Sequence, residues 1–418
     1  MGLLIENQGG NYKVLVNLRI KILVLLVFIG LALAASQTQA GGLYLNEFGT
    51  PSMGTAGAGA SAWAIDASTS FHNAAGMTRL DGNQFMLSGG LLYASIVFDP
   101  DPNTPVPGND GGQAGGPAPL LGAFYVHSLS DDWKLGLNVI SISAAILDYK
   151  DNWTGRYLIQ DTSIFTLTLN PTIAYRVNDW LSLGGGISLM YGTLEQNVAA
   201  PTPSKLDGNI NIDGNDTEIG FNLNALFEVS ETTRFGLAYA YEMEPSFSSD
   251  VTITPPSLQA GIDATIIFPQ LLRGSVYHEI NKQWALVGTI GWENWSAFEN
   301  ITISTARGDR LIPRNWDDTW KFAAGVHYKI NDNVLLQFGA AYDTSPIDDP
   351  KDRTPDMPMD EQIRLGAGVQ YDWSEKINIG CAFTYAFYGD AEIDNPSLIG
   401  DYKSNDLYFL AVNAAWKF

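Results

Sequence analysis

Few side chains in this sequence have the types and spacing that chemistry requires. The histidines are scattered, and none has a second histidine or a carboxylate at the spacing of a metal site. Cys381 is the only cysteine, which excludes a disulfide or a thiolate cluster within one chain. Neither a Gly-x-Ser-x-Gly elbow nor a phosphate-binding loop is present. We therefore expect no cofactor and no enzyme, although a phospholipase-like serine and histidine could still meet in space. The histidines are His72, His127, His278 and His327.

The basic side chains suggest a different chemistry, which is the recognition of a carboxylate. Three of them fall on inward-facing positions of the strands predicted below, and one lies in the loop motif Gly155-Arg156-Tyr157. A ligand with one carboxylate and a long apolar tail needs an apolar cavity and one or two such cations. The alternative is that each cation pairs with an inward acid such as Glu293 or Asp372. The four candidates are Arg156, Arg273, Lys321 and Arg364.

A repeated pattern of strands and turns from Asn83 onward would position these residues. Strands of about ten residues or more alternate with short polar turns and with long segments rich in proline, aspartate and glycine. Six short turns and seven long connections predict fourteen strands. The short turns are 130–132, 178–179, 230–232, 281–283, 331–333 and 374–376. The long connections are near 98–118, 148–161, 197–210, 247–261, 303–317, 344–361 and 390–405.

Side-chain alternation places one face of each strand in lipid. In 334–342 and 377–387, bulky apolar residues alternate with small or polar ones, as expected for lipid outside and a lumen inside. No stretch after residue 40 reaches the length of a membrane helix, and without helices only a closed barrel satisfies its backbone in a bilayer. We therefore predict an all-β fold, a 14-stranded antiparallel transmembrane β-barrel over 83–418. Its short turns and both of its ends would face the periplasm.

Residues 1–40 have the composition of an export signal. Basic residues precede the apolar run 22–35, and Ala40 supplies a small residue at the cleavage point. The run is shorter than the ~20 residues of a membrane span, which disfavours a membrane anchor. A soluble β-sandwich would also alternate, but it would need neither this signal nor a final strand that ends in an aromatic residue, Phe418. The net charge of −22 argues against nucleic acid as a partner.

Residues 41–82 do not alternate. They are too apolar for a disordered tail and too short for an independent domain, so we expect a partly helical plug, or hatch, in the barrel lumen. The motifs Leu45-Asn46-Glu47-Phe48 and Asn73-Ala74-Ala75-Gly76-Met77 resemble the hatch of the FadL family of outer-membrane long-chain fatty acid transporters. That family usually has proline where this chain has Ala74, so the hatch backbone would be less rigid there. Further matching segments are 151–157, 170–176, 181–184, 317–322, 342–347 and 353–355.

The resemblance implies passive uptake of hydrophobic molecules across the bacterial outer membrane. Outer loops near 98–118 and 247–268 would capture the ligand, an apolar lumenal pocket would bind it, and it would leave sideways past the hatch. Long-chain fatty acids are the expected ligands. Aromatic hydrocarbons such as toluene, or a polar porin or structural barrel, are the alternatives. The residues expected at the hatch are Asn73, Ala74, Ala75 and Gly76, and those expected at a lateral opening in the third strand are Ile140, Ser141, Ile142 and Ser143.

The predicted location also implies partners. Outer-membrane lipid and lipopolysaccharide would surround the barrel, and the terminal strand ending in Phe418 resembles the recognition signal of the bacterial barrel-insertion machinery. No segment resembles the energy-coupling box of active transporters, so differential affinity and mass action would have to drive transport.

Overall fold

The computed structural model describes residues 47–201, 207–254, 258–298, 300–305 and 308–418, all of them within one compact unit, Gln39–Phe418. The predicted export signal, 1–40, lies outside the described residues. In the part of the chain that is described, no helix is long and apolar enough to span a membrane.

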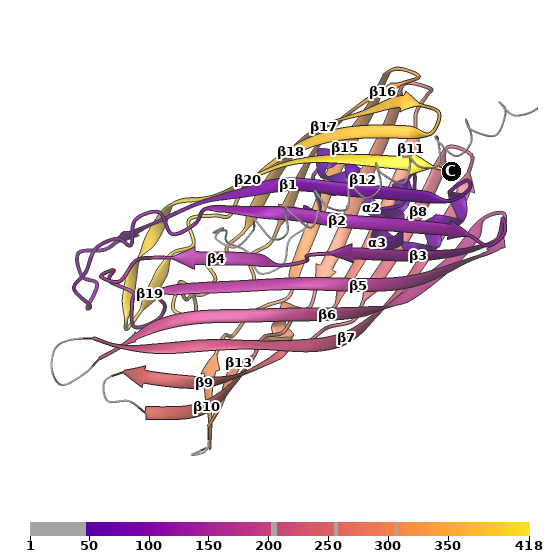
Figure 1. Ribbon diagram of the computed structural model, residues 1–418. Helices are drawn as coiled ribbons and strands as arrows, with labels where there is room; N and C mark the ends of the chain where they lie inside the picture. The colour runs from indigo at the N-terminus through magenta and orange to yellow at the C-terminus, as the bar shows by residue number, and fades with distance from the viewer. Residues whose placement is uncertain (1–46, 202–206, 255–257, 299, 306–307) are drawn as a thin grey trace, which may run out of the picture. The chain divides into compact units, whose positions relative to one another are not determined.

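Fourteen antiparallel strands form a closed barrel, as predicted (Figure 1). Each wall strand pairs with the wall strand before it, and β1 (Gln84–Pro100) pairs with β20 (Leu398–Lys417) to close the wall. Strands end at all six predicted short turns. The other wall strands are β2 (Pro117–Ser128), β3 (Trp133–Ile140), β5 (Asp161–Asn178), β6 (Leu181–Ala200), β7 (Gly208–Ser230), β8 (Thr233–Ala240), β11 (Leu271–Glu279), β12 (Trp284–Glu293), β15 (Thr319–Asn331), β16 (Val334–Asp343), β17 (Gln362–Ser374) and β18 (Ile377–Phe387).

Shorter strands extend the wall at the end that carries the long connections. β9 pairs with β10, and β13 pairs with β14, so most of the described residues of 247–261 and 303–317 are paired strands where loops were predicted. Most of 390–405 is also strand. The loop prediction was wrong because it was based on the many turn-forming residues in these segments. A strand can still form there when a neighbouring strand edge supplies hydrogen-bond partners, as the edge of β7 does for β9. The shorter strands are β4 (Ala144–Asp148), β9 (Ser246–Thr254), β10 (Leu258–Thr265), β13 (Asn300–Thr305), β14 (Gly308–Pro313) and β19 (Ile393–Asn395).

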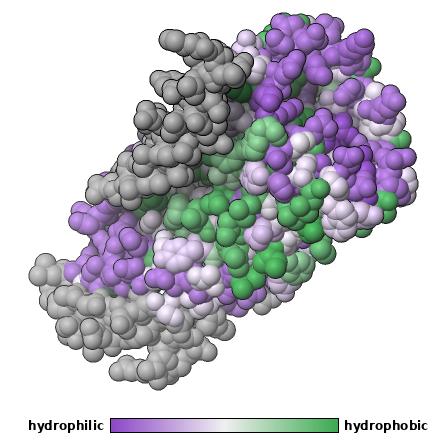
Figure 2. Space-filling view, turned by 45° about the vertical axis from the view of Figure 1, so that its right-hand side comes forward, coloured by the Kyte–Doolittle hydropathy of each residue, from purple (hydrophilic) through white to green (hydrophobic). Residues whose placement is uncertain are grey.

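Exposure along the wall follows the predicted alternation. In β18, Ile379 and Phe383 are 42% and 43% exposed, whereas Ala382 and Thr384 are buried. Figure 2 shows hydrophobic residues across the middle of the face in view and hydrophilic residues gathered toward its upper right. Aromatic side chains border the short turns, as in the interfacial girdle of a membrane barrel. They include Trp133, Tyr175, Trp180, Trp284, Tyr371 and Trp373.

An aromatic cluster packs the long connections together at the other end of the barrel. The rings of Tyr149 and Trp153 stack with their centroids 4.1 Å apart, and the hydroxyls of Tyr149 and Tyr402 are 2.6 Å apart. Phe98 packs edge-on against both Trp153 and Tyr402. All four side chains are buried. These side chains therefore join the long connections into one packed layer at this end of the barrel.

The segment before β1 folds into the lumen as a hatch, which confirms the predicted plug (Figure 1). Glycines on the inner wall let the hatch backbone approach closely. A Cβ at Gly236 would collide with the Ser61 carbonyl, and a Cβ at Gly339 would collide with the backbone of Thr55. The hatch elements are η1 (Pro51–Thr55), α2 (Ala60–Trp63), α3 (Thr69–His72) and η2 (Ala74–Arg79).

Candidate functional site

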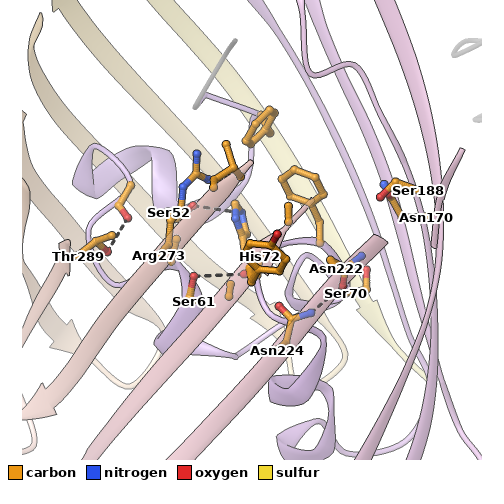
Figure 3. A pocket seen from close by; sticks show the side chains of 18 of the residues that line it. Ser52, Ser61, Ser70, His72, Asn170, Ser188, Asn222, Asn224, Arg273 and Thr289 are labelled. Atoms are coloured by element: carbon orange, nitrogen blue, oxygen red, sulfur yellow. Dashed lines mark hydrogen bonds between the residues drawn. The ribbon is translucent and has the colours of Figure 1, made fainter. Parts of the chain in front are cut away.

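A small cavity lies between the hatch and the inner wall (Figure 3). Phe48, Phe71 and His72 line it from the hatch side, and residues of β5, β6, β7, β8, β11, β12 and β15 line it from the wall. Its volume is about 90 Å³, whereas sites that enclose a whole ligand measure roughly 300–1,000 Å³. In this conformation the cavity has room for a polar head group, and a long chain enters only if the hatch moves.

Two of the predicted cations, Arg273 on β11 and Lys321 on β15, line this cavity. Arg273 Nη2 donates to Glu293 Oε1 at 3.2 Å, so this residue makes the pairing that we considered as the alternative. The Lys321 ammonium is buried and lies 3.9 Å from Asp343 Oδ1, beyond hydrogen-bond distance. Among the described residues it has no hydrogen-bond partner. Burying an ammonium without such partners is costly, and a ligand carboxylate would remove that cost.

The third cation, Arg364, connects the start of the hatch to the wall. Its Nε lies 3.3 Å from Glu47 Oε1, and its other nitrogens donate to Asp343 and Gln362. Arg364 is 1% exposed and Glu47 is 2% exposed. Asp343 faces both Arg364 and Lys321. The ammonium of the cavity is therefore linked, through one shared carboxylate, to the ion pair that holds the hatch.

Arg156 lies apart from these three cations. Its Nε is 2.6 Å from Asp207 Oδ2, and its Nη1 donates to the carbonyls of Pro107 and Trp153 at 2.8 and 3.0 Å. Hydrogen bonds from Tyr157 and Arg156 lower the pKa of the Asp207 carboxyl, so this acid stays ionised. The observed partners of Arg156 join three outer segments of the chain to one another, which matches the structural alternative for this residue.

A serine and a histidine do meet in the hatch. His72 Nε2 lies 3.3 Å from Ser52 Oγ and 2.9 Å from Thr50 Oγ1. Burial, and then the charge of Arg273, lower the pKa of His72 to about 3, so the ring is neutral and a poor base near pH 7. A hydrolytic triad places a carboxylate on the second ring nitrogen, and within the described ranges no such bond is found. The pair serves to cross-link the hatch.

Asn73 joins the hatch to the wall at the predicted hatch motif. Its Nδ2 donates to the Ser61 carbonyl at 2.7 Å and to the Ala225 carbonyl on β7 at 2.9 Å. Its Oδ1 accepts from the Ala75 N–H at 3.1 Å and so caps η2. The residues behind it, 74–76, are buried. One asparagine thus bonds to two hatch elements and one wall strand.

The third wall strand is interrupted where the sequence is apolar on both faces. β3 ends at Ile140 and β4 begins at Ala144, and the intervening residues 141–143 are all buried. β2 pairs with β3 as far as Gly122, and in the described part of the barrel no ladder joins the rest of β2 to β4. Across the break, three residues face two on β5, so the chain has one extra residue there, as in a β-bulge.

This break in the wall lies close to the cavity. Asn170, which lines the cavity, is paired in the β3–β5 ladder with Asn138, two residues before β3 ends. The break is bordered by buried apolar side chains, among them Leu120 on β2, Ile142 and Leu147, and also by the buried serines Ser141 and Ser143. An apolar group that passed through here would therefore meet a mixed surface with two serine hydroxyls.

Sequence analysis missed the neutral polar side chains of the cavity. Asn170, Asn222 and Asn224 line it together with Ser188 and Thr289. The alternation of side chains along each strand could have assigned them to the inner face. Their position along the barrel axis relative to the hatch could not be predicted, because the sequence does not reveal how the hatch folds. Glu47 was also missed as a partner of Arg364, because the hatch has no periodicity that would orient it.

Comparison with known proteins gives one consistent result. Residues 31–418 match the family described as outer membrane protein transport protein (OMPP1/FadL/TodX). A long-chain fatty acid transport protein of Salmonella typhi is 27% identical over 398 residues, which cover 85% of this chain and 90% of that protein.

Two solved structures share the fold. A FadL homologue of Pseudomonas aeruginosa has a TM-score of 0.84 at 22% identity, covering 90% of this chain and 100% of that one. The toluene transporter TodX of P. putida has a TM-score of 0.67 at 16% identity, covering 89% and 98%.

Proposed function

Because this chain belongs to the OMPP1/FadL/TodX family of outer membrane transport proteins, we propose that the hydrophobic compounds it carries across the outer membrane are long-chain fatty acids. The relative from S. typhi that is named for fatty acid transport supports this ligand class. Our proposal assigns the ligand carboxylate to the cavity under Arg273 and Lys321, and the apolar tail to the lumen above it. The ligand leaves sideways through the break in the third strand.

The observation that carries this proposal is the buried ammonium of Lys321. A neutral hydrocarbon cannot satisfy a buried cation, whereas a carboxylate can accept from Lys321 and from Arg273 together. The shared acid Asp343 then couples binding to the hatch. A carboxylate beside Lys321 would alter the charge that Lys321 and Arg364 share around Asp343. It would thereby weaken the contact of Arg364 with Glu47 and free the start of the hatch.

The surroundings below the hatch favour lateral release. A cavity of about 680 Å³ opens on the side of the short turns, and charged residues such as Arg79, Glu279 and Asp372 line it. An apolar tail that crossed this cavity would displace water from charged groups without replacing their hydrogen bonds. The break between β2 and β4 carries no charged side chain, and its residues 141–143 are an isoleucine between two serines.

Binding of oleate and toluene to the purified protein tests the ligand class. Lys321→Met keeps the apolar stem and removes the charge, so we expect oleate affinity to fall about 10- to 100-fold, the worth of a charge-assisted hydrogen bond. Toluene affinity should not change. Lys329→Met, on the same strand but in the polar cavity below the hatch, is the matched control. Unchanged oleate binding in Lys321→Met, or a wild-type preference for toluene, would overturn the proposal.

Planar-bilayer recording separates transport of hydrophobic compounds from a polar porin. The described hatch fills the lumen with packed backbone, so we expect the wild-type protein to show little steady ion conductance. A large and constant conductance would instead support the porin alternative.

A further inference from the structure

One wall of the cavity is built from neutral amides rather than apolar groups. Asn170 lies on β5, Ser188 on β6, and Asn222 and Asn224 on β7 (Figure 3). Asn170 and Asn224 are only 4% and 8% exposed. Burying a carboxamide in a channel for hydrophobic compounds is costly unless its hydrogen bonds are made. These groups can satisfy one another, bind water, or bind a polar group of the ligand.

The amides satisfy one another only in part. Asn170 Nδ2 donates to Asn138 Oδ1, and Asn224 Nδ2 donates to Asn222 Oδ1, both at 2.7 Å. Two acceptors remain, the Oδ1 atoms of Asn170 and Asn224, and one donor group, the Nδ2 of Asn222. Throughout the described part of the chain we find no hydrogen-bond partner for these three groups or for the Ser188 hydroxyl. The wall therefore offers both donors and acceptors to whatever enters the cavity.

The amides and the cations lie in one register around the barrel. The strand ladders align Asn224 with Ala238, Ala238 with Arg273, Arg273 with Gly291, and Gly291 with Lys321. Adjacent strands are ~4.8 Å apart, so Asn224 and Arg273 are separated by roughly 10 Å at their backbones. The two positions between the polar ones, Ala238 and Gly291, are small. This leaves space for a ligand between an amide at one end and two cations at the other.

We propose that the preferred ligand is a fatty acid with a hydroxyl group close to its carboxylate, such as a 3-hydroxy acid. This inference rests on the proposed function, because it takes the carboxylate to be held by Arg273 and Lys321. A hydroxyl both donates and accepts, which matches the open groups of the amide wall. Since the cavity is only about 90 Å³, both polar groups must lie within a few carbons of each other. An unsubstituted acid leaves the amide wall without partners.

Competition binding with the full mature chain in detergent tests this inference, using 3-hydroxypalmitate, palmitate and toluene. We expect wild type to bind the hydroxy acid about 3- to 10-fold more tightly than palmitate, the effect of one or two neutral hydrogen bonds. Asn224→Leu and Asn222→Leu should each reduce the ratio of the two affinities to less than about twofold. Asn413→Leu is the matched control, since Asn413 is also buried but lies on β20 and does not line the cavity.

The outcomes separate this inference from the proposed function. Equal wild-type affinity for the two acids, or a preference that survives both substitutions, overturns the inference and leaves fatty acid uptake intact. If neither acid binds, both the inference and the proposed function are overturned. Retention of the folded, heat-modifiable band on a gel shows that each variant barrel is intact. Asn224→Thr is a second variant with a smaller, still polar side chain, and it should keep part of the preference for the hydroxy acid.

Discussion

The two ends of the hatch are attached to the barrel in different ways. At the start, Glu47 meets Arg364 in a buried ion pair, and the Phe48 carbonyl accepts a hydrogen bond from Ser88 Oγ at 3.0 Å. Phe48 also lines the cavity between the hatch and the wall. The stability of this end therefore depends on charge that a ligand anion can also supply.

The later part of the hatch is held mainly through its backbone carbonyls, together with one ion pair between Arg79 and Glu228. Arg234 donates to the carbonyls of Ala62 and Trp63, both at 2.7 Å, and its guanidinium lies 3.9 Å from the centroid of the Tyr277 ring. Arg176 donates to the Thr78 carbonyl at 2.5 Å. Neither Arg234 nor Arg176 lines the cavity to which we assign the ligand carboxylate. This difference predicts a hatch whose start can be released while the remainder stays fixed.

The largest effect should come from filling a glycine under the fixed part. Gly236→Val places a branched side chain where the Ser61 carbonyl now sits, so α2 must leave the wall. We expect steady ion conductance in planar bilayers and a loss of stability of at least about 1–3 kcal/mol, the usual cost of overpacking. Gly274→Val is the control, because a Cβ there meets only the Ile290 carbonyl, at 4.0 Å. Equal conductance of the two variants would show that the hatch is not seated on this glycine.

The next effect distinguishes the two ends by charge removal. Glu47→Gln takes away the hatch's competitor for Arg364, so we expect oleate affinity to rise about 3- to 10-fold, or up to ~1.4 kcal/mol. Glu228→Gln removes the ion pair with Arg79 at the fixed end. It should leave oleate affinity unchanged and loosen the hatch, which proteolysis can detect. If both variants change affinity alike, the ends are not functionally different.

The sequence predicts the inward-facing residues of the barrel wall better than it predicts the contact of the hatch with Arg364, for a physical reason. Strand parity assigns Arg273, Lys321 and Arg364 to the lumen because successive side chains in a strand point to opposite faces. The contact of Glu47 with Arg364 joins an aperiodic segment to a strand more than 300 residues away, and no local pattern encodes it. The hairpins at 247–261 and 303–317 were missed for a related reason, since their pairing depends on a neighbouring strand edge rather than on their own composition.

The smallest effect concerns Ala74, where the resembled family has proline. Ala74 is the first residue of η2, a position whose N–H has no partner within the helix, and Asn73 before it is extended, with φ −167° and ψ 98°. Proline is compatible with both conditions. Ala74→Pro should therefore stabilise the hatch by about 0.4–1 kcal/mol by restricting the unfolded chain. Hydrogen exchange at the amides of η2 should slow by a factor of about 2–5. Oleate affinity should not change, because the substitution acts on the part of the hatch that we expect to stay fixed. A change in affinity would mean that η2 moves together with Glu47.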